Sequence, residues 1–212
     1  MICGVDEAGK GSVLGPMVIA AVGCMQMDDL AALGVADSKK LTRESRERIN
    51  TNLRGQFPFS VIVRSAEDID LLRQSMKMNE IVARAHAEAL DALSCTIAYL
   101  DACDVNEKRY EETVASFSTS GCTIIARHKA DALYPPVSAA SIVAKVERDH
   151  LVMELAGVYG NIGSGYPSDS VTIAFLQDYI RTQNRPPPIA RSSWETVKQM
   201  IHRKNQRSLL DF

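Results

Sequence analysis

The sequence predicts an α/β protein in which a mixed β-sheet is flanked by helices and followed by a C-terminal helical lobe. Short apolar runs typical of strands lie in the first part of the chain, whereas the pattern is helical after Pro135-Pro136. With 212 residues, 46% of them hydrophobic, the chain can bury a substantial core. We therefore expect a single domain over residues 1–212, with a helical extension at about 168–205 and a short tail at 206–212.

The individual elements follow from periodicity and from turn residues. Ser65 and Asp68 have capping-box spacing, which predicts a short helix beginning after Ser65. Breaks in the C-terminal helical pattern are expected at 160–167 and 185–188. The remaining predictions are strands near 2–6, 16–25, 57–64, 96–101 and 122–127, and helices near 42–54, 78–93 and 107–116.

Two acidic residues, Asp6 and Glu7, end the first apolar run and are followed by Gly9 and Gly11. Two negative charges at the end of an apolar strand cost free energy unless a cation lies beside them. A strand that carries carboxylates into a glycine turn suits a hydrolytic site that holds a divalent metal against a phosphate. An isolated Asp-Glu pair after a strand is more often an ordinary acidic turn.

The same segment argues against two nucleotide-binding motifs. A P-loop needs Ser or Thr directly after its Lys to ligate magnesium, but Gly11 follows Lys10. Gly9, Gly11 and Gly15 are also spaced wrongly for the dinucleotide fingerprint. Neither a P-loop nor a Rossmann site is therefore predicted.

Further acids follow two later strands. Asp101 ends the strand near 96–101, and Asp131 comes a few residues after the strand near 122–127. Ligand sites in open α/β sheets gather at strand ends, so these acids can converge with the first pair. Asp104 and Asp149 are competitors, which we interpret as surface charges.

Six segments carry a resemblance to a known family, in this order along the chain: 6–11 (Asp-Glu-Ala-Gly-Lys-Gly), 37–41 (Asp-Ser-Lys-Lys-Leu), 99–101 (Tyr-Leu-Asp), 128–131 (His-Lys-Ala-Asp), 137–146 (Val-Ser-Ala-Ala-Ser-Ile-Val-Ala-Lys-Val) and 163–169 (Gly-Ser-Gly-Tyr-Pro-Ser-Asp). Together they resemble the type 2 ribonucleases H, or ribonuclease HII, in their archaeal form. This resemblance implies a ribonuclease H-like fold that cuts the RNA strand of RNA/DNA hybrids and nicks duplex DNA at embedded ribonucleotides. One departure is that Lys10 replaces the usual Arg of a Gly-Arg-Gly motif, which keeps the charge but loses the planar guanidinium.

The resemblance also implies a catalytic set of four metal-binding acids: Asp6, Glu7, Asp101 and Asp131. Four carboxylates suit two hard cations, one activating water and the other stabilising the leaving oxygen. All-oxygen ligands favour Mg²⁺ or Mn²⁺. We expect Asp6 to bridge the ions and the products to carry 5'-phosphate and 3'-hydroxyl ends. His128 lies three residues before Asp131, where its imidazole could assist a proton transfer.

Choosing RNA requires recognition of the 2'-hydroxyl. By resemblance, the amides of Gly9, Lys10 and Gly11 grip the scissile nucleotide, and Tyr166 senses the junction between a ribonucleotide and DNA. The alternative for Tyr166 is packing in a turn between helices. Further phosphate contacts are predicted at Lys39, Lys40, Lys145 and Arg191.

Charge and cysteine content fit this interpretation. Residues 181–212 hold seven Lys or Arg and two acids, a balance of +5, which leaves −7 elsewhere in a chain of net charge −2. The basic segment could follow a phosphate backbone, or it could be a solvated tail. The five cysteines are odd in number and lack Cys-x-x-Cys spacing, so we expect reduced thiols in a cytoplasmic protein. We also expect a monomer without membrane spans.

The last seven residues resemble the peptide by which replication and repair enzymes dock on the ring-shaped sliding clamp. Gln206, Leu209 and Phe212 recur every third residue, as one turn of tight helix requires. The second aromatic residue of that peptide is missing. The alternative is a tail packed on its own domain.

Three other functions remain open at this stage. A related two-metal nuclease or a transposase-like enzyme would share the acids without the segment around Tyr166. A type 3 ribonuclease H usually carries an additional N-terminal substrate-binding domain, for which Asp6 leaves no room. A non-catalytic module would bind hybrids without metal-dependent cutting.

Overall fold

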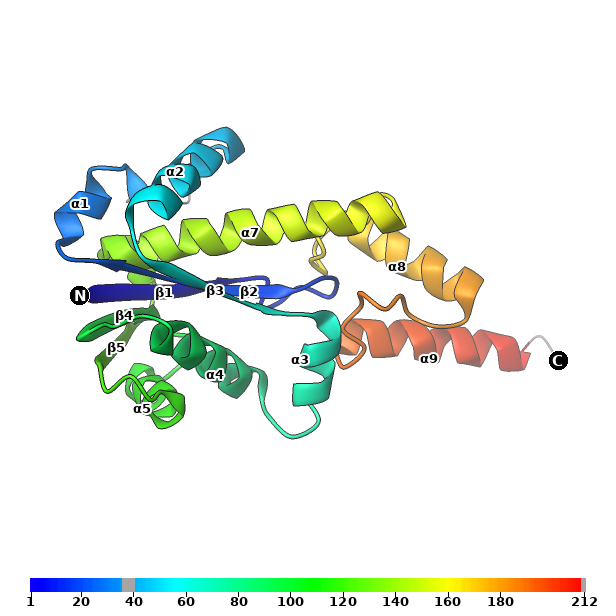
Figure 1. Cartoon of the computed structure of the whole chain (residues 1–212). Helices are drawn as coiled ribbons and strands as arrows, with labels where there is room; N and C mark the ends of the chain where they lie inside the picture. The colour runs from blue at the N-terminus through cyan, green and yellow to red at the C-terminus, as the bar shows by residue number, and fades with distance from the viewer. Residues whose placement is uncertain (36–40, 211–212) are drawn as a thin grey trace. The chain divides into compact units, whose positions relative to one another are not determined.

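The computed structural model describes residues 1–35 and 41–210, and within the last helix it describes side chains as far as Arg203. Figure 1 shows the arrangement of the elements. The strands are β1 (Ile2–Ala8), β2 (Met17–Cys24), β3 (Phe59–Arg64), β4 (Ile97–Asp101) and β5 (Thr123–Arg127). The helices are α1 (Met27–Ala31), α2 (Arg43–Gln56), α3 (Ala66–Leu72), α4 (Met78–Asp91), α5 (Glu107–Phe117), α6 (Ala130–Leu133), α7 (Pro135–Tyr159), α8 (Ser170–Gln183) and α9 (Glu195–Leu210).

The chain divides into two compact units, and the division crosses the sequence several times. The first unit contains residues 1–8, 18–63 and 77–147, and the second contains residues 9–17, 64–76 and 148–212. The segment around Gly9 therefore belongs with the C-terminal helices, although it directly follows the first strand. The expected extension at about 168–205 lies inside the second unit.

The first unit is built on a five-stranded mixed sheet with the order β3-β2-β1-β4-β5. β1 pairs antiparallel with β2 and parallel with β4, and β4 pairs parallel with β5. Helices α4 and α5 lie on one side of the sheet, and α2 and the first half of α7 lie on the other (Figure 1). β2 is buried along its whole length because both of its faces are covered.

The central strand lies in close contact with α7. A Cβ atom added at Gly4 would approach the carbonyl carbon of Pro136 to 2.1 Å, so only glycine allows the helix backbone this near. The contact fixes the start of α7 against β1. It thereby sets which turns of α7 face the end of that strand.

The second unit has its own apolar core, formed by the loop after β1 and the C-terminal helices. Val13 and Leu14 pack with Leu176 of α8 and Val197 of α9. Leu14 also forms an antiparallel bridge with Ala190. Asp169 caps α8 by accepting a hydrogen bond from the Val171 amide at 2.9 Å, which satisfies one of the free donors of the first turn.

Most predicted elements are confirmed, including all five strands and the capping box of Ser65 and Asp68. The sequence did not predict the short helices α1 and α6. Gln206 to Leu210 continue α9 as α-helix rather than forming a separate turn of tight helix. In the part of the chain that the structure describes, no helix is both long enough and apolar enough to span a bilayer.

Candidate active site

Two of the predicted catalytic acids, Asp6 and Asp101, lie on neighbouring strands of the first unit. Val5 of β1 pairs with Leu100 of β4, so the next residues, Asp6 and Asp101, lie level at the same end of two parallel strands. Parallel strands carry their carboxyl ends to one edge of a sheet, which is where ligands bind in open α/β folds. The structure therefore brings these two predicted acids together.

Asp6 is enclosed in an unfavourable electrostatic environment. Its side chain is 7% exposed. Burial, followed by the negative charges of Glu7 and Asp101, raises the pKa of Asp6 well above its usual value, and the hydrogen bond from the Glu7 amide opposes this in part. A divalent cation would remove this penalty, because it adds positive charge where two further carboxylates lie close by.

Asp131 lies in α6, and a hydrogen bond from the residue before it joins this helix to the end of β4. The Ala130 amide donates a 2.9 Å hydrogen bond to Oδ1 of Asp101, and Asp131 is the next residue. Lys129, which precedes α6, has a left-handed backbone with φ of 57°, and this turns the chain into the helix. Asp131 is 6% exposed, so it is buried in the first unit as Asp6 is.

Glu7 is held by residues that the sequence analysis did not assign to the site. Its Oε2 atom lies 3.1 Å from Nε2 of His86, and its Oε1 atom accepts a 3.0 Å hydrogen bond from Sγ of Cys103. The other ring nitrogen of His86 lies 3.1 Å from the Tyr110 hydroxyl. Burial raises the pKa of Tyr110 well above its usual value, so this hydroxyl stays protonated.

His86 lies in the helix expected near 78–93, where the sequence alone suggests an ordinary surface or packing residue and does not predict the contact with Glu7. The side chain is fully buried in α4. Its spacing of four residues from Val82 and from Leu90, both buried, places it on the apolar face of the helix. That spacing was the available signal. No comparable signal pointed to Cys103.

Asp6 is also linked to α7 through Ser141 and Lys145. The Ser141 side chain forms a hydrogen bond with Asp6 that lowers its pKa, against the larger effect of burial. Nζ of Lys145 donates to the Ser141 hydroxyl at 2.7 Å, across one helical turn. Lys145 was predicted to contact a phosphate. In the structure it is half-buried and supports the residue that holds Asp6.

In the second unit, the glycine loop and Tyr166 form one structure. The Gly9 amide donates a 3.1 Å hydrogen bond to the Tyr166 hydroxyl, so this amide already has a partner within the protein. The Gly165 carbonyl accepts hydrogen bonds from the Val13 and Leu14 amides at 2.8 and 3.1 Å. Tyr166 is half-buried, and Gly11 is exposed with open space at its Cβ position. The structure thus joins two segments for which separate roles in substrate binding were predicted.

Arg148, which the sequence analysis did not identify, supports this loop from α7. It is 4% exposed and donates hydrogen bonds to the carbonyls of Pro16 and Ser164 at 3.3 and 3.1 Å. Its guanidinium lies 4.7 Å from the ring centroid of Tyr166, as a cation–π contact requires. Gly9 has φ of +85°, and a Cβ atom there would lie 2.2 Å from Nε of Arg148. Glycine is therefore required at position 9 for two separate reasons.

The prediction that Arg191 contacts a phosphate needs correction, because its side chain is fully buried. The guanidinium donates to the carbonyl of Lys10 at 2.9 Å and to the carbonyl of Gly15 at 3.1 and 3.3 Å, and it lies over the Trp194 ring. Burial and the charge of Arg148 lower the pKa of Arg191 to about 9, so it is still protonated at neutral pH. Arg191 thus fixes the shape of the loop.

The remaining predicted residues are either exposed, as His128 is, or have side chains outside the part of the chain that the structure describes. Lys39, Lys40 and Phe212 fall outside the described residues, and the side chains of Gln206 and Leu209 are likewise undescribed. His128 is exposed, its amide donates to Glu107 at 2.7 Å, and its ring lies 3.4 Å from the Val105 carbonyl.

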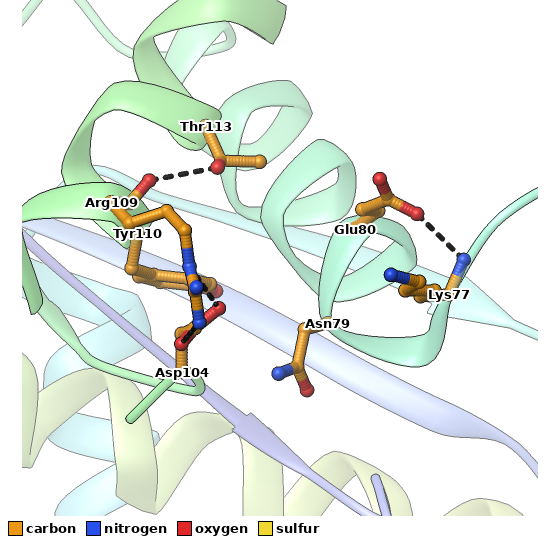
Figure 2. A pocket seen from close by; sticks show the side chains of 7 residues that line it. All are labelled: Lys77, Asn79, Glu80, Asp104, Arg109, Tyr110 and Thr113. Carbon is orange, nitrogen blue, oxygen red and sulfur yellow. Dashed lines mark hydrogen bonds and ion pairs between the residues drawn. The ribbon is translucent and has the colours of Figure 1, made fainter. Parts of the chain in front are cut away.

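A cavity of about 310 Å³ lies beside α4 and α5 in the first unit (Figure 2). Asp104 and Arg109, which line it, form an ion pair with each other. This pairing accounts for Asp104, the acid that was considered as a competitor of Asp101. None of the four predicted catalytic acids lines the cavity.

Comparison with known proteins decides the family. The family model described as Ribonuclease HII matches residues 3–197. The chain is 71% identical over 212 residues to a Ribonuclease HII of Methanospirillum hungatei, covering 100% of both chains.

The chain belongs to the ribonuclease HII family.

Solved structures agree with this assignment. The ribonuclease H2 of Pyrococcus horikoshii OT3 superposes with a TM-score of 0.89 at 38% identity, covering 97% of this chain and 99% of that one. The ribonuclease HII of Archaeoglobus fulgidus, solved in complex with PCNA, gives a TM-score of 0.87 at 40% identity and covers 92% and 95%. The predicted ribonuclease H-like fold is confirmed. Like its family, the chain is a metal-dependent endonuclease that cleaves RNA in RNA/DNA hybrids and at embedded ribonucleotides.

Proposed function

We propose that this ribonuclease HII cuts by two-metal-ion hydrolysis at Asp6, Glu7, Asp101 and Asp131, leaving 5'-phosphate and 3'-hydroxyl ends. The observation that carries the proposal is the buried Asp6 carboxyl, which lies level with Asp101 and has a raised pKa. Carboxylate oxygens are the donors that Mg²⁺ and Mn²⁺ prefer, so the residues fit these ions. When bound, the ions would supply an activated water and stabilise the leaving oxygen.

The protein's own contribution is to orient the carboxylates before substrate arrives. Ser141 holds Asp6 from α7, and the Ala130 amide holds Asp101. With its oxygens fixed in this way, each carboxylate loses little conformational freedom when it binds an ion. Asp6 is our choice as the bridging ligand.

We propose that the loop containing Gly9, Lys10 and Gly11 recognises the scissile ribonucleotide together with Tyr166. Because the Gly9 amide is engaged by the Tyr166 hydroxyl, the proposed contact with the 2'-hydroxyl falls to the later part of the loop and to Tyr166 itself. Gly11, which is exposed with open space around it, allows a close approach of nucleic acid to the backbone. Lys39, Lys40 and Lys145 remain proposed phosphate contacts.

The proposal is tested on a duplex that contains one ribonucleotide, incubated with Mg²⁺ or Mn²⁺. We expect one cut beside the ribonucleotide and none in an all-DNA duplex of the same sequence. Tyr166→Ala should reduce cutting of this duplex by a larger factor than it reduces metal binding. Cutting of the all-DNA duplex would instead indicate a different nuclease of the same fold, and equal activity of Tyr166→Ala would leave Tyr166 with only a packing role.

We further propose that the C-terminal tail docks on a sliding clamp through Gln206, Leu209 and Phe212. Support comes from the three-residue spacing of these side chains and from the related Archaeoglobus fulgidus enzyme, which was solved with PCNA. The enzyme would act as a cytoplasmic monomer, consistent with its five free thiols. Deletion of residues 206–212 should weaken clamp binding in calorimetry and leave cutting of short duplexes nearly unchanged. Equal clamp affinity of the intact and shortened proteins would exclude this role.

A further inference from the structure

Glu7, His86 and Cys103 bring three different metal-binding atom types to one place in the first unit. One ligand atom from each residue lies within 4.8 Å of the other two. Within this group, Glu7 Oε2 lies 3.1 Å from His86 Nε2, and Glu7 Oε1 lies 3.0 Å from Cys103 Sγ. The carboxylate therefore lies between an imidazole nitrogen and a sulfur atom.

These distances are close to those that a tetrahedral zinc ion requires. Zinc binds nitrogen at about 2.0–2.1 Å and sulfur at about 2.3 Å, so its neighbouring ligand atoms lie roughly 3.3–3.8 Å apart. The three side chains would need to shift by about 1 Å or less to reach this spacing. Three protein ligands leave the fourth position of the ion for a water molecule.

The donor set selects zinc over the ions that serve the reaction. Sulfur and imidazole ligands favour zinc and similar transition metals, whereas Mg²⁺ prefers oxygen ligands only. Tyr110 adds a second support, because its hydroxyl lies 3.1 Å from Nδ1 of His86 and can accept a hydrogen bond from a proton carried on that nitrogen. This leaves Nε2, the atom that faces Glu7, with a free electron pair for a metal.

We propose that Glu7, His86 and Cys103 form a binding site for one Zn²⁺ ion, and that this ion inhibits the enzyme by holding the Glu7 carboxylate away from the magnesium ligands. Binding would release the thiol proton of Cys103 to solvent, since the thiolate is the ligand form. The inhibition rests on the proposed role of Glu7 in magnesium binding. The zinc site itself does not depend on that role.

Direct metal binding tests the site without any measurement of activity. Cobalt(II) serves as the probe because its bond to a thiolate gives a strong absorption band, and zinc displaces it. We expect the band in the wild type with one equivalent of Co²⁺, its loss on addition of one equivalent of Zn²⁺, and its absence in Cys103→Ser. In competition with a chromogenic chelator, Cys103→Ser should bind zinc at least about tenfold more weakly.

Cys122→Ser is the matched control, because Cys122 is half-buried as Cys103 is and lies near the thiol of Cys95. This variant should keep the cobalt band. A band that disappears in Cys122→Ser and persists in Cys103→Ser would place the ion at the other thiols and overturn the proposal. A wild type that shows no thiolate band would overturn it as well. His86→Gln, which removes the nitrogen ligand and keeps a polar side chain, should weaken zinc binding as Cys103→Ser does.

The proposed inhibition is tested by measuring the rate of cutting with and without zinc. For each variant, the rate with zinc is divided by the rate of the same variant in Mg²⁺ alone. The zinc concentration that halves cutting should rise at least about tenfold in Cys103→Ser and stay unchanged in Cys122→Ser, and a chelator should restore the wild type. Equal inhibition of all variants would place the inhibitory ion at the aspartates and overturn the proposed inhibition. If no variant cuts the single-ribonucleotide duplex, the proposed function fails, while the cobalt band still decides the zinc site.

Discussion

The two compact units bury charges of opposite sign and accommodate them differently. In the first unit, Asp6 is buried beside Glu7 and Asp101, and its raised pKa measures the cost of that arrangement. In the second unit, Arg148 and Arg191 are buried, but each guanidinium donates to main-chain carbonyls and lies over an aromatic ring. Burial lowers the pKa of both arginines, yet the protein itself supplies their partners.

The difference separates two uses of buried charge. Burying a charge costs several kcal/mol unless partners compensate for it. Where carbonyls and rings provide the compensation, as around Arg191, the charge stabilises the shape of a loop. Where further carboxylates surround the charge, as around Asp6, the protein does not supply this compensation, and the proposed metal site would supply it through a bound cation. On this proposal the first unit carries the chemistry, and the second carries a rigid loop.

The largest effect is expected from removing an acid of the first unit. Asp101→Asn keeps the size of the side chain but removes the charge of a metal ligand, so the rate of cutting in Mg²⁺ should fall at least about a hundredfold. The fold should be unchanged, as judged by circular dichroism. Asp178→Asn, at an exposed acid paired with Arg181, is the control and should cut at the wild-type rate. Wild-type turnover of Asp101→Asn would show that Asp101 is not a metal ligand of the reaction.

A smaller loss of activity is expected when a buried arginine of the second unit is replaced. Arg148→Lys keeps the charge but loses one of the two carbonyl contacts and the planar group over Tyr166. We expect kcat/KM at a single embedded ribonucleotide to fall about tenfold while Mn²⁺ affinity stays unchanged. Arg181→Lys, at an exposed arginine, should have no effect. If Arg148→Lys weakens Mn²⁺ binding as much as cutting, the two units do not have separate roles.

Alanine substitutions at Gly9 and Gly11, two glycines of the loop in the second unit, should differ in their effect on the stability of the fold. Gly9→Ala would place a Cβ atom 2.2 Å from Nε of Arg148 in a backbone with φ of +85°, so it should destabilise the fold by at least about 1–2 kcal/mol. Gly11→Ala meets no atom within 4 Å and should leave the unfolding midpoint nearly unchanged. Any loss of cutting in Gly11→Ala would then report substrate approach. Equal unfolding midpoints of the two variants would contradict the close packing described around Gly9.

The sequence predicted the sheet and the acids because both depend on local patterns. Apolar runs that end in Asp6 and Asp101 identify the strands and the acids together, and parallel pairing then brings the acids to one edge. The supporting residues could not be predicted in the same way. Arg148 contacts the carbonyls of Pro16 and Ser164, and neither residue is a neighbour of Arg148 in the sequence. Arg191 contacts the carbonyls of Lys10 and Gly15, near the other end of the chain. Nothing in their local sequence distinguishes them from solvated arginines.

Glu7 illustrates the same limit within the first unit. Its position after Asp6 at the end of an apolar run does not show which residues surround its carboxylate. Successive residues of a strand point to opposite faces, and the Glu7 carboxylate lies against His86 of α4 while Asp6 meets Ser141 of α7. The partner of each acid depends on which helix covers that face, and this is a property of the tertiary structure.

The central claim is that the buried charge of Asp6 is compensated by a bound cation, and thermal unfolding of the wild type and Asp6→Asn with and without Mn²⁺ tests it most directly. Because the pKa of Asp6 is raised in the folded state, this side chain destabilises the metal-free fold at neutral pH, and the effect is lost as the pH falls towards the ordinary pKa of aspartate. Without metal, Asp6→Asn should therefore unfold at a higher temperature than the wild type, by about 2–4 °C for each kcal/mol relieved. Mn²⁺ should raise the unfolding temperature of the wild type and have little effect on the variant. A variant that is less stable without metal, and that gains as much from Mn²⁺ as the wild type does, would contradict the account.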